Sequence, residues 1–195
     1  MHTDIHSESA WESQVFENVD FSSVKFGERT FEDCTFAGCN FSLANLQGTS
    51  FVQCSFRQCK FANTTLNDCK LSEVVFSDCS VIGLDFSKCK KLLFSIRFDR
   101  CHMQVVSFSS MNLSGTSFGS SRLTECDFYE TDLRKVDFTH CDFAGTQFEN
   151  CDLQEADFRH AVSYHIDPTK NKIKNARFSI PEVLSFLAPL QISIE

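Results

Sequence analysis

The feature that most constrains this sequence is a large apolar residue at every fifth position. Two such series run through the chain, and they contain nineteen of its 22 Phe, although it has only 2 Tyr and 1 Trp. The first series is Phe16, Phe21, Phe26, Phe31, Phe36, Phe41, Leu46, Phe51, Phe56, Phe61, Leu66, Leu71, Phe76, Val81 and Phe86. The second series is Phe98, Met103, Phe108, Leu113, Phe118, Leu123, Phe128, Leu133, Phe138, Phe143, Phe148, Leu153 and Phe158. Internal repeats of this kind decide the fold before any local propensity does.

A second position of the repeat, two residues before each large one, holds small or apolar side chains. Arg29 is the only charged residue at either position from Phe16 to Cys89 and from Ile96 to Ala161. We therefore expect both positions to face a common core and the other three to face solvent. All 11 cysteines fall at this second position: Cys34, Cys39, Cys54, Cys59, Cys69, Cys79, Cys89, Cys101, Cys126, Cys141 and Cys151.

A period of five fits neither regular secondary structure. On an α-helix a step of five residues is a rotation of about 140°, so the large residues would be spread around the whole helix. On a flat strand an odd step alternates faces, so the large residues would point up and down in turn. The pattern instead predicts short extended segments separated by corners, which together form a coil that stacks on itself.

These repeats resemble those of the pentapeptide-repeat family, whose pattern is A(D/N)LXX. Residues 126–145 read C-D-F-Y-E, T-D-L-R-K, V-D-F-T-H and C-D-F-A-G. The resemblance covers about residues 14–161 and implies an all-β, right-handed quadrilateral β-helix with four pentapeptides per turn. The two series would then form about seven turns, a rod roughly 35 Å long before its caps. The interval from Phe86 to Phe98 is two residues too long, so we expect a register break at residues 89–97.

The ends of the chain depart from the repeat. Residues 1–13 are predicted to be a partly flexible N-terminal cap, 14–161 the β-helix, and 162–195 a C-terminal cap that also joins two chains. Ser179 and Glu182 have the spacing of a capping box, which predicts a short helix, and residues 191–195 alternate like a strand. The alternatives at this end are a simple cap and a twofold dimer. The predicted dimer interface is Phe178, Val183, Leu184, Phe186, Leu187, Leu190, Ile192 and Ile194.

Charge is unevenly distributed along a chain whose formal net charge is -8. Ten acids lie between residues 125 and 157, opposed there only by Arg134 and Lys135. Six of them are the Asp of the repeat, so one interpretation is that they belong to the fold; the other is an acidic surface that attracts a basic partner. A basic segment, residues 88–100, lies at the register break. The ten acids are Glu125, Asp127, Glu130, Asp132, Asp137, Asp142, Glu149, Asp152, Glu155 and Asp157.

The sequence contains no pattern that indicates catalysis or a cofactor. The cysteines are spaced by the repeat and not as C-x-x-C pairs, so we interpret them as reduced core thiols of a cytoplasmic protein and not as metal ligands or disulfides. The six His are scattered, and no nucleophile with a neighbouring base stands out. We therefore expect no enzymatic activity, no metal and no cofactor. The chain also lacks a long apolar stretch and a signal-peptide pattern.

The C-terminal segment 176–194, A-R-F-S-I-P-E-V-L-S-F-L-A-P-L-Q-I-S-I, resembles that of the Qnr, MfpA and McbG group within this family. The resemblance implies a DNA-mimicking cytoplasmic homodimer that binds DNA gyrase or topoisomerase IV and modulates it or protects it against quinolones or other gyrase poisons. The net charge of -8 and the lack of a long apolar stretch argue against direct binding to nucleic acid and against a membrane span. Many Qnr proteins have two outward loops, whereas this sequence has one short break. The alternative function is a non-catalytic scaffold for a different protein partner.

Overall fold

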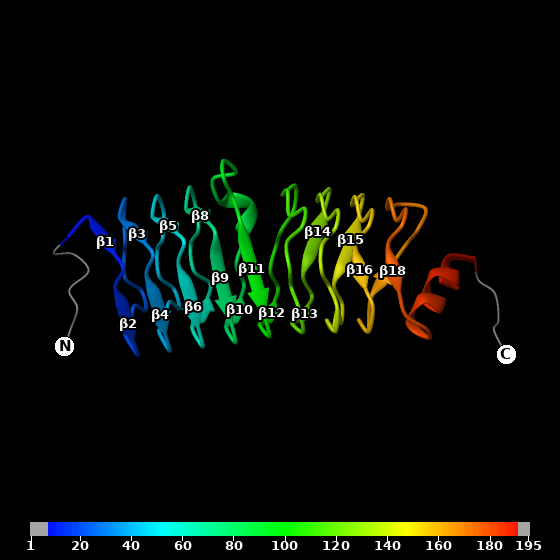
Figure 1. Cartoon of the computed structure of the whole chain (residues 1–195), viewed down its shortest axis with the longest axis horizontal. Coiled ribbons are helices and arrows are strands. Elements are labelled where there is room, and N and C mark those ends of the chain that lie inside the picture. Colours follow the sequence, from blue (N-terminus) through cyan, green and yellow to red (C-terminus); the bar gives the residue numbers. More distant parts are fainter. Residues whose placement is uncertain (1–7, 191–195) are drawn as a thin grey trace.

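The computed structural model describes residues 8–190, and the side chains of residues 8–187. It is a straight rod, with the N-terminal strands at one end and the C-terminal helix at the other (Figure 1). Each turn of the coil has four sides. The fold is the predicted right-handed quadrilateral β-helix, with about eight turns. The additional turn arises because Trp11 pairs in register with Phe31 at one end and Phe178 with Phe158 at the other.

Parallel strands stack on each of the four sides, which we number in chain order. The first side carries β1 (Ala10–Glu12), β3 (Thr30–Glu32), β5 (Ser50–Val52) and β8 (Lys70–Ser72). The second side carries β2 (Val15–Glu17), β4 (Thr35–Ala37), β6 (Ser55–Arg57), β9 (Val74–Ser77) and β11 (Ile96–Asp99), and later β16 (Asp157–Phe158) and β18 (Arg177–Phe178).

The third side carries β7 (Lys60–Ala62), β10 (Ser80–Ile82), β12 (His102–Gln104) and β13 (Arg122–Thr124). The fourth side carries β14 (Asp127–Tyr129), β15 (Gln147–Glu149) and β17 (His165–Ile166). Isolated parallel bridges such as Asn45↔Thr65 and Asp132↔Asp152 continue the same stacking where no strand is long enough to be named. Residues 20 apart are therefore neighbours over most of the rod.

The predicted inward positions are confirmed. Every large residue of both series is at most 5 % exposed, and all 11 cysteines are buried and free. The Phe rings stack along each side, for example Phe128 on Phe148 with centroids 5.1 Å apart and planes 2° apart, while rings on different sides meet edge to face, as Phe138 and Phe143 do on adjacent sides. A rod with only five residues per side fills its interior with these two positions alone.

The corners are made by residues with positive φ, usually two places after the large one. Asn18 (φ 53°) and Asp33 (φ 51°) are examples, and each donates its backbone N–H to a carbonyl of the following turn. Left-handed backbone is costly for side-chain-bearing residues, and these hydrogen bonds offset that cost. Glycine fills the same corner at Gly38, whose added Cβ would collide with Asn18 Oδ1 of the preceding turn.

The predicted register break is confirmed. After η1 (Phe86–Lys88), the chain leaves the first side as a loop and rejoins the stack at β11, so that Ile96 pairs with Val74, 22 residues earlier. The loop projects from the rod beside β11 (Figure 1, green). Its tip exposes Leu92 (79 %) and Leu93 (65 %), the latter with φ 58°.

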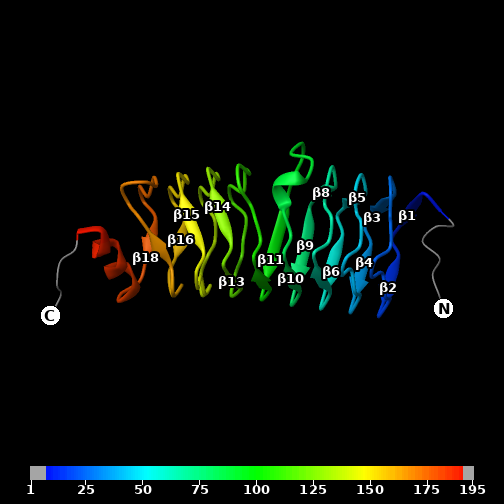
Figure 2. The same cartoon turned by 180° about the vertical axis from the view of Figure 1, so that it is seen from behind.

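The C-terminal end is covered by η2 (Glu182–Leu190), a 3-10 helix that packs against the last turn (Figure 2). Phe178 stacks on Phe158 at 5.2 Å, and Phe186 meets Phe178 edge to face at 4.7 Å. A short helix follows Ser179, as the capping-box spacing predicts. The Ser179 Oγ, however, accepts a hydrogen bond from the backbone N–H of His160. The expected strand at 191–195 lies outside the described residues.

Candidate functional site

The ten predicted acids form a band around the rod, which we name the acidic belt. Asp132 and Asp152 stack on the first side, Asp137 and Asp157 on the second, and Asp142 pairs with Arg122 on the third. Asp127 begins β14 on the fourth side, opposite Gln147. The structure thus brings the acids together along the rod axis but distributes them over all four sides.

The aspartates of the belt also support the local backbone. Asp132, Asp137, Asp152 and Asp157 each accept a hydrogen bond from the backbone N–H two residues later, at 2.9–3.3 Å. The same bond is made by Asp20 outside the belt, so it belongs to the repeat. This contact explains why the repeat has Asp or Asn at this place, and it leaves part of each carboxylate facing solvent.

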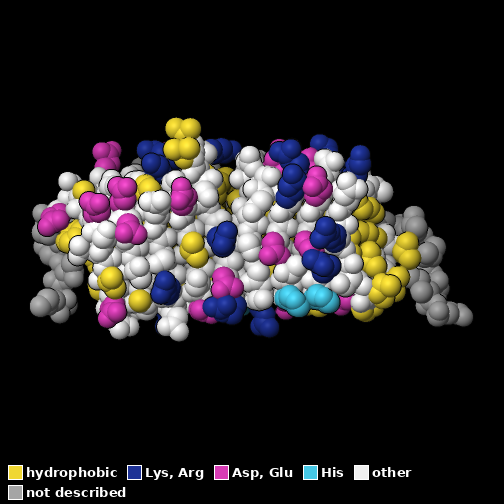
Figure 3. Space-filling view, viewed as in Figure 1, with side chains coloured by type: hydrophobic (Ala, Val, Ile, Leu, Met, Phe, Trp, Pro, Cys, Tyr) yellow, Lys and Arg dark blue, Asp and Glu magenta, His cyan; other side chains and the backbone are white. Residues whose placement is uncertain are grey.

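The neighbouring turns bring cations to the belt that the linear sequence does not place there. Within residues 8–187, ion pairs connect six of the ten acids to Lys or Arg. They are Asp132–Arg134 (2.6 Å), Asp142–Arg122 (3.4 Å), Glu149–Lys170 (3.7 Å), Asp152–Lys172 (3.7 Å), Glu155–Lys135 (3.9 Å), Asp157–Arg159 (2.7 Å) and Asp157–Arg177 (3.9 Å). Acidic and basic side chains accordingly alternate on the face seen in Figure 3.

Two of these pairs perturb their carboxyl groups. Hydrogen bonds from Arg134 lower the pKa of Asp132, and hydrogen bonds from Arg159 lower the pKa of Asp157. Both arginines approach the carboxylate with Nε and Nη2, the two-point geometry that favours the charged form. These two aspartates therefore stay ionised, and the charge of the paired arginine partly offsets the negative charge of each carboxylate.

Four acids of the belt, Glu125, Asp127, Glu130 and Asp137, have no ion pair within 4 Å among the described side chains. All four lie within a single turn of the coil. Glu125 and Glu130 occupy corners with φ of 53° and 51°, where the side chain points away from the rod. A hydrogen bond to Glu130 raises the pKa of the neighbouring Tyr129 phenol. This turn is the most negative part of the acidic belt.

Sequence reasoning missed a histidine pair on the corner between the second and third sides. The rings of His140 and His160 stack with centroids 4.8 Å apart and planes 17° apart. The twenty-residue spacing would have indicated this contact. Among residues 8–190 no group of three or more His, Cys, Asp or Glu side chains surrounds a point where a metal ion could bind.

Five of the predicted dimer residues, Phe178, Val183, Leu184, Phe186 and Leu187, are described and lie at the C-terminal end of the rod. Phe178 and Phe186 pack partly against the core, and Val183 and Leu187 are half-buried. Leu184 is 44 % exposed, and Ile180, which the prediction omitted, is 82 % exposed. The side chain of Leu190 and both Ile192 and Ile194 lie outside the described residues. No helix among the described residues is long and apolar enough to cross a membrane.

Family models match the sequence of the chain, and solved structures match its fold. Family models match residues 49–128 (pentapeptide repeat region) and 132–162 (pentapeptide repeats, 8 copies), more than half of the chain between them. A model of the SV2A/B/C luminal domain matches residues 1–86. No curated protein matches the sequence significantly.

Among solved structures, two trypsin-treated variants of QnrB1, a plasmid-mediated fluoroquinolone resistance protein, share the fold. The first has a TM-score of 0.55 and 17 % identity, covering 95 % of this chain and 100 % of QnrB1. The second has a TM-score of 0.54 and 17 % identity, covering 100 % of this chain and 95 % of QnrB1. By its sequence repeats and its four-sided coil, this chain belongs to the pentapeptide-repeat proteins.

Proposed function

We propose that this chain is a non-catalytic, DNA-mimicking protein that binds DNA gyrase or topoisomerase IV and modulates it or protects it against quinolones or other gyrase poisons. The acidic belt on a straight rod is the observation that carries the proposal. The shared fold with QnrB1 supports it as well, because QnrB1 is a fluoroquinolone resistance protein. The rod itself would bind no nucleic acid and no membrane, and its site of action would be the cytoplasm.

The physical basis of the mimicry is a regular negative charge on a stiff body. Duplex DNA carries one charge per about 1.7 Å of its axis, and a topoisomerase holds it in a basic channel. The acidic belt surrounds the rod as phosphates surround DNA, so a basic channel can contact it from several sides. The turn that contains Glu125, Asp127, Glu130 and Asp137 would make the strongest contacts, because these acids have no ion pair within 4 Å among the described side chains.

We also propose that two chains associate through their C-terminal ends. Ile180 and Leu184 expose apolar surface there, next to the half-buried Val183 and Leu187. Association would cover this surface and place both acidic belts near the centre of a longer rod. Sedimentation velocity tests this directly: Ile180→Glu with Leu184→Glu should convert a dimer to a monomer, and a wild-type monomer at micromolar concentration would refute the proposal.

The function is tested by a supercoiling assay with purified DNA gyrase, titrated with the protein in the presence and absence of ciprofloxacin. Restored supercoiling in the presence of the drug would establish protection. Inhibition without restoration would keep gyrase binding and DNA mimicry but remove protection against that drug. An effect on neither reaction, repeated with topoisomerase IV, would overturn the proposal.

Charge reversal separates the acidic belt from the fold. Glu125→Lys with Glu130→Lys changes two exposed corner residues that no ion pair holds, so folding should be retained while inhibition or protection falls at least about tenfold. The matched control is Glu17→Lys with Glu73→Lys, which makes the same charge change on exposed residues outside the acidic belt. Equal losses in both variants would show that only net charge matters.

The second candidate is a scaffold for a different protein partner. One observation favours it: Leu92 and Leu93 are exposed at the loop tip, beside Lys90 and Lys91 and outside the acidic belt. A protein that uses this surface would bind independently of Glu125 and Glu130. If wild type does not bind gyrase but binds another protein, and Leu92→Ser with Leu93→Ser abolishes that binding while the corner charge variant retains it, the scaffold is favoured.

A further inference from the structure

Four cysteines occupy the same place in four consecutive turns, just before the strands of the third side. The residues that follow them are paired in register, Asn40↔Lys60, Lys60↔Ser80 and Ser80↔His102. Each cysteine is at most 2 % exposed. We name the set the thiol column: Cys39, Cys59, Cys79 and Cys101.

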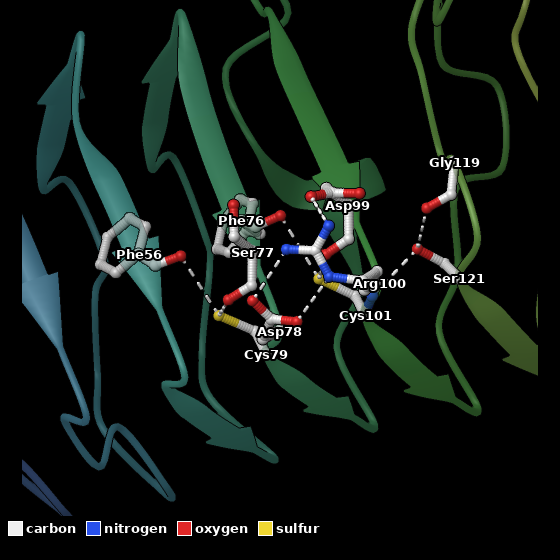
Figure 4. A network of polar contacts seen from close by, with 10 residues as sticks. All are labelled: Phe56, Phe76, Ser77, Asp78, Cys79, Asp99, Arg100, Cys101, Gly119 and Ser121. Atoms are coloured by element: carbon white, nitrogen blue, oxygen red, sulfur yellow. Dashed lines mark hydrogen bonds and ion pairs between the residues drawn. The ribbon is translucent and has the colours of Figure 1, made fainter.

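The four thiols share one geometry. Each Sγ–H donates to the carbonyl of the large residue on the second side, one turn earlier: Phe16, Phe36, Phe56 and Phe76, at 3.3, 3.3, 3.4 and 3.4 Å. Figure 4 shows two of these contacts, Cys79 to Phe56 and Cys101 to Phe76. Because the contact repeats unchanged, the side chains share one orientation, and their sulfurs repeat with the spacing of the coil, about 4.8 Å.

This spacing matches a specific kind of metal coordination. Metal–thiolate bonds are about 2.3 Å long, so two of them in a line span about 4.6 Å. Thiolates are the ligands that select Cu(I) over harder ions, and monovalent ions of this type accept two sulfurs in a linear arrangement. We propose that the thiol column is a binding site for soft monovalent cations such as Cu(I), each held between the sulfurs of two adjacent turns.

The four thiols could supply ligands for two such ions without sharing a ligand. Cys39 with Cys59 would hold one, and Cys79 with Cys101 the other. Each thiol loses its proton when the metal–sulfur bond forms, so binding of one ion releases up to two protons.

The thiols also lie immediately below the surface. Each follows a corner residue with positive φ, for example Gln58, Asp78 and Arg100, so the sulfur is one residue from solvent and not on the rod axis. Over Cys79 and Cys101 the corner is closed by an ion pair between Arg100 Nε and Asp78 Oδ1 at 2.9 Å (Figure 4).

Other cysteines provide the internal control. Cys126 and Cys151 are equally buried, but residues one turn away at their position are not cysteine: Thr146 lies beside Cys126, and Asn171 beside Cys151. Serine is tolerated at such places, because Thr64, Thr131 and Thr146 donate the same hydrogen bond to a carbonyl 23 residues earlier. Cysteine-to-serine variants should therefore fold.

The experiment titrates the reduced full-length protein with Ag(I), a redox-stable probe with the same charge and sulfur preference. Excess imidazole removes ions from surface histidines, and native mass spectrometry counts those that remain. Cys59→Ser with Cys79→Ser leaves no adjacent pair in the column, so it should bind about two ions fewer than wild type. Cys126→Ser with Cys151→Ser removes the same number of thiols and should lose none.

The counts decide between the outcomes. The stacked pairs Cys34–Cys54 and Cys69–Cys89 are present in both variants, so their contribution cancels in the comparison. A loss confined to the column variant, together with sulfur-to-metal charge-transfer absorption in wild type, supports the site. Equal losses in both variants, or no difference from wild type in a column variant with unchanged circular dichroism, would overturn it.

Discussion

The aromatic ring of Phe36 lies parallel to that of Phe56, with centroids 4.9 Å apart and planes 14° apart. Phe56 continues the stack to Phe76 at 5.1 Å and is 1 % exposed. Replacing Phe56 with alanine would therefore leave a cavity on one of the four sides of its turn. We predict that Phe56→Ala lowers the free energy of unfolding by about 3–5 kcal/mol, measured by urea denaturation.

Leucine is the matched substitution at this position, because Leu66 and Leu71 are buried at the same position of the repeat on other sides of the coil. Phe56→Leu should cost less than about 1.5 kcal/mol. Similar costs for the two variants, or a cost near zero for Phe56→Ala, would contradict the role of the Phe stack in stability.

Replacing a corner glycine with alanine should cost different amounts of stability in different turns. Gly38 and Gly115 both have positive φ, 63° and 72°, but an added Cβ at Gly38 would collide with Asn18 Oδ1, whereas one at Gly115 meets nothing within 4 Å. Gly115→Ala should cost about 1–2 kcal/mol for the left-handed backbone alone. Gly38→Ala should cost at least about 1 kcal/mol more, and equal thermal shifts would show that Asn18 moves away freely.

The loop at the register break should be dispensable for folding. Deleting Leu92 and Leu93 restores a turn of 20 residues and removes a leucine with positive φ, while the pairing of β9 with β11 can be kept. The free energy of unfolding should change by less than about 1 kcal/mol. Deleting Phe128 and Tyr129 instead shifts every later inward residue, and this control should fail to fold.

Stability should fall in acid because of two aspartates. The pKa values of Asp132 and Asp157 are lowered by hydrogen bonds from Arg134 and Arg159, so the folded state binds their protons less readily than the unfolded state. A lowered pKa stabilises the fold above the unfolded value of about 3.9, and this stabilisation is lost as pH falls through the folded value.

The unfolding temperature should therefore decrease from about pH 5 to pH 2. Asp157→Asn should make that decrease smaller, with Glu17→Gln as the control for loss of one surface carboxylate. The effect is modest since both pairs are largely exposed to solvent. An unchanged slope in Asp157→Asn would exclude the arginine pair as a source of the acid sensitivity.

The sequence predicted the fold almost completely, because the repeat shows directly which side chains are buried. The inward positions from Phe16 to Phe158 could be read from the period of five, and the extra residues between Phe86 and Phe98 located the loop. The number of turns was underestimated, because Trp11 and Phe178 continue the stack outside the regular series. At these ends capping contacts replace the repeat, and its pattern is lost.

The candidate site was predicted less well, and the reason is the stacking itself. The window 125–157 contains two cations. The neighbouring turns add Arg122, Lys170, Lys172 and Arg177, and Arg159 lies just beyond the window. A linear window cannot represent this neighbourhood. The same is true of His140 and His160, whose contact depends only on being one turn apart.

The change from 20 to 22 residues at the loop has a consequence for how such a protein evolves. Asp132 is in contact with Asp152, and Asp152 with Lys172, so a substitution at one place alters the selection on residues one turn away. Related sequences should therefore show paired changes at an interval of 20, except across the loop, where the interval becomes 22. The two inserted residues therefore mark where the interval between paired positions changes. The position of this change in related sequences would show whether their loops descend from the same insertion.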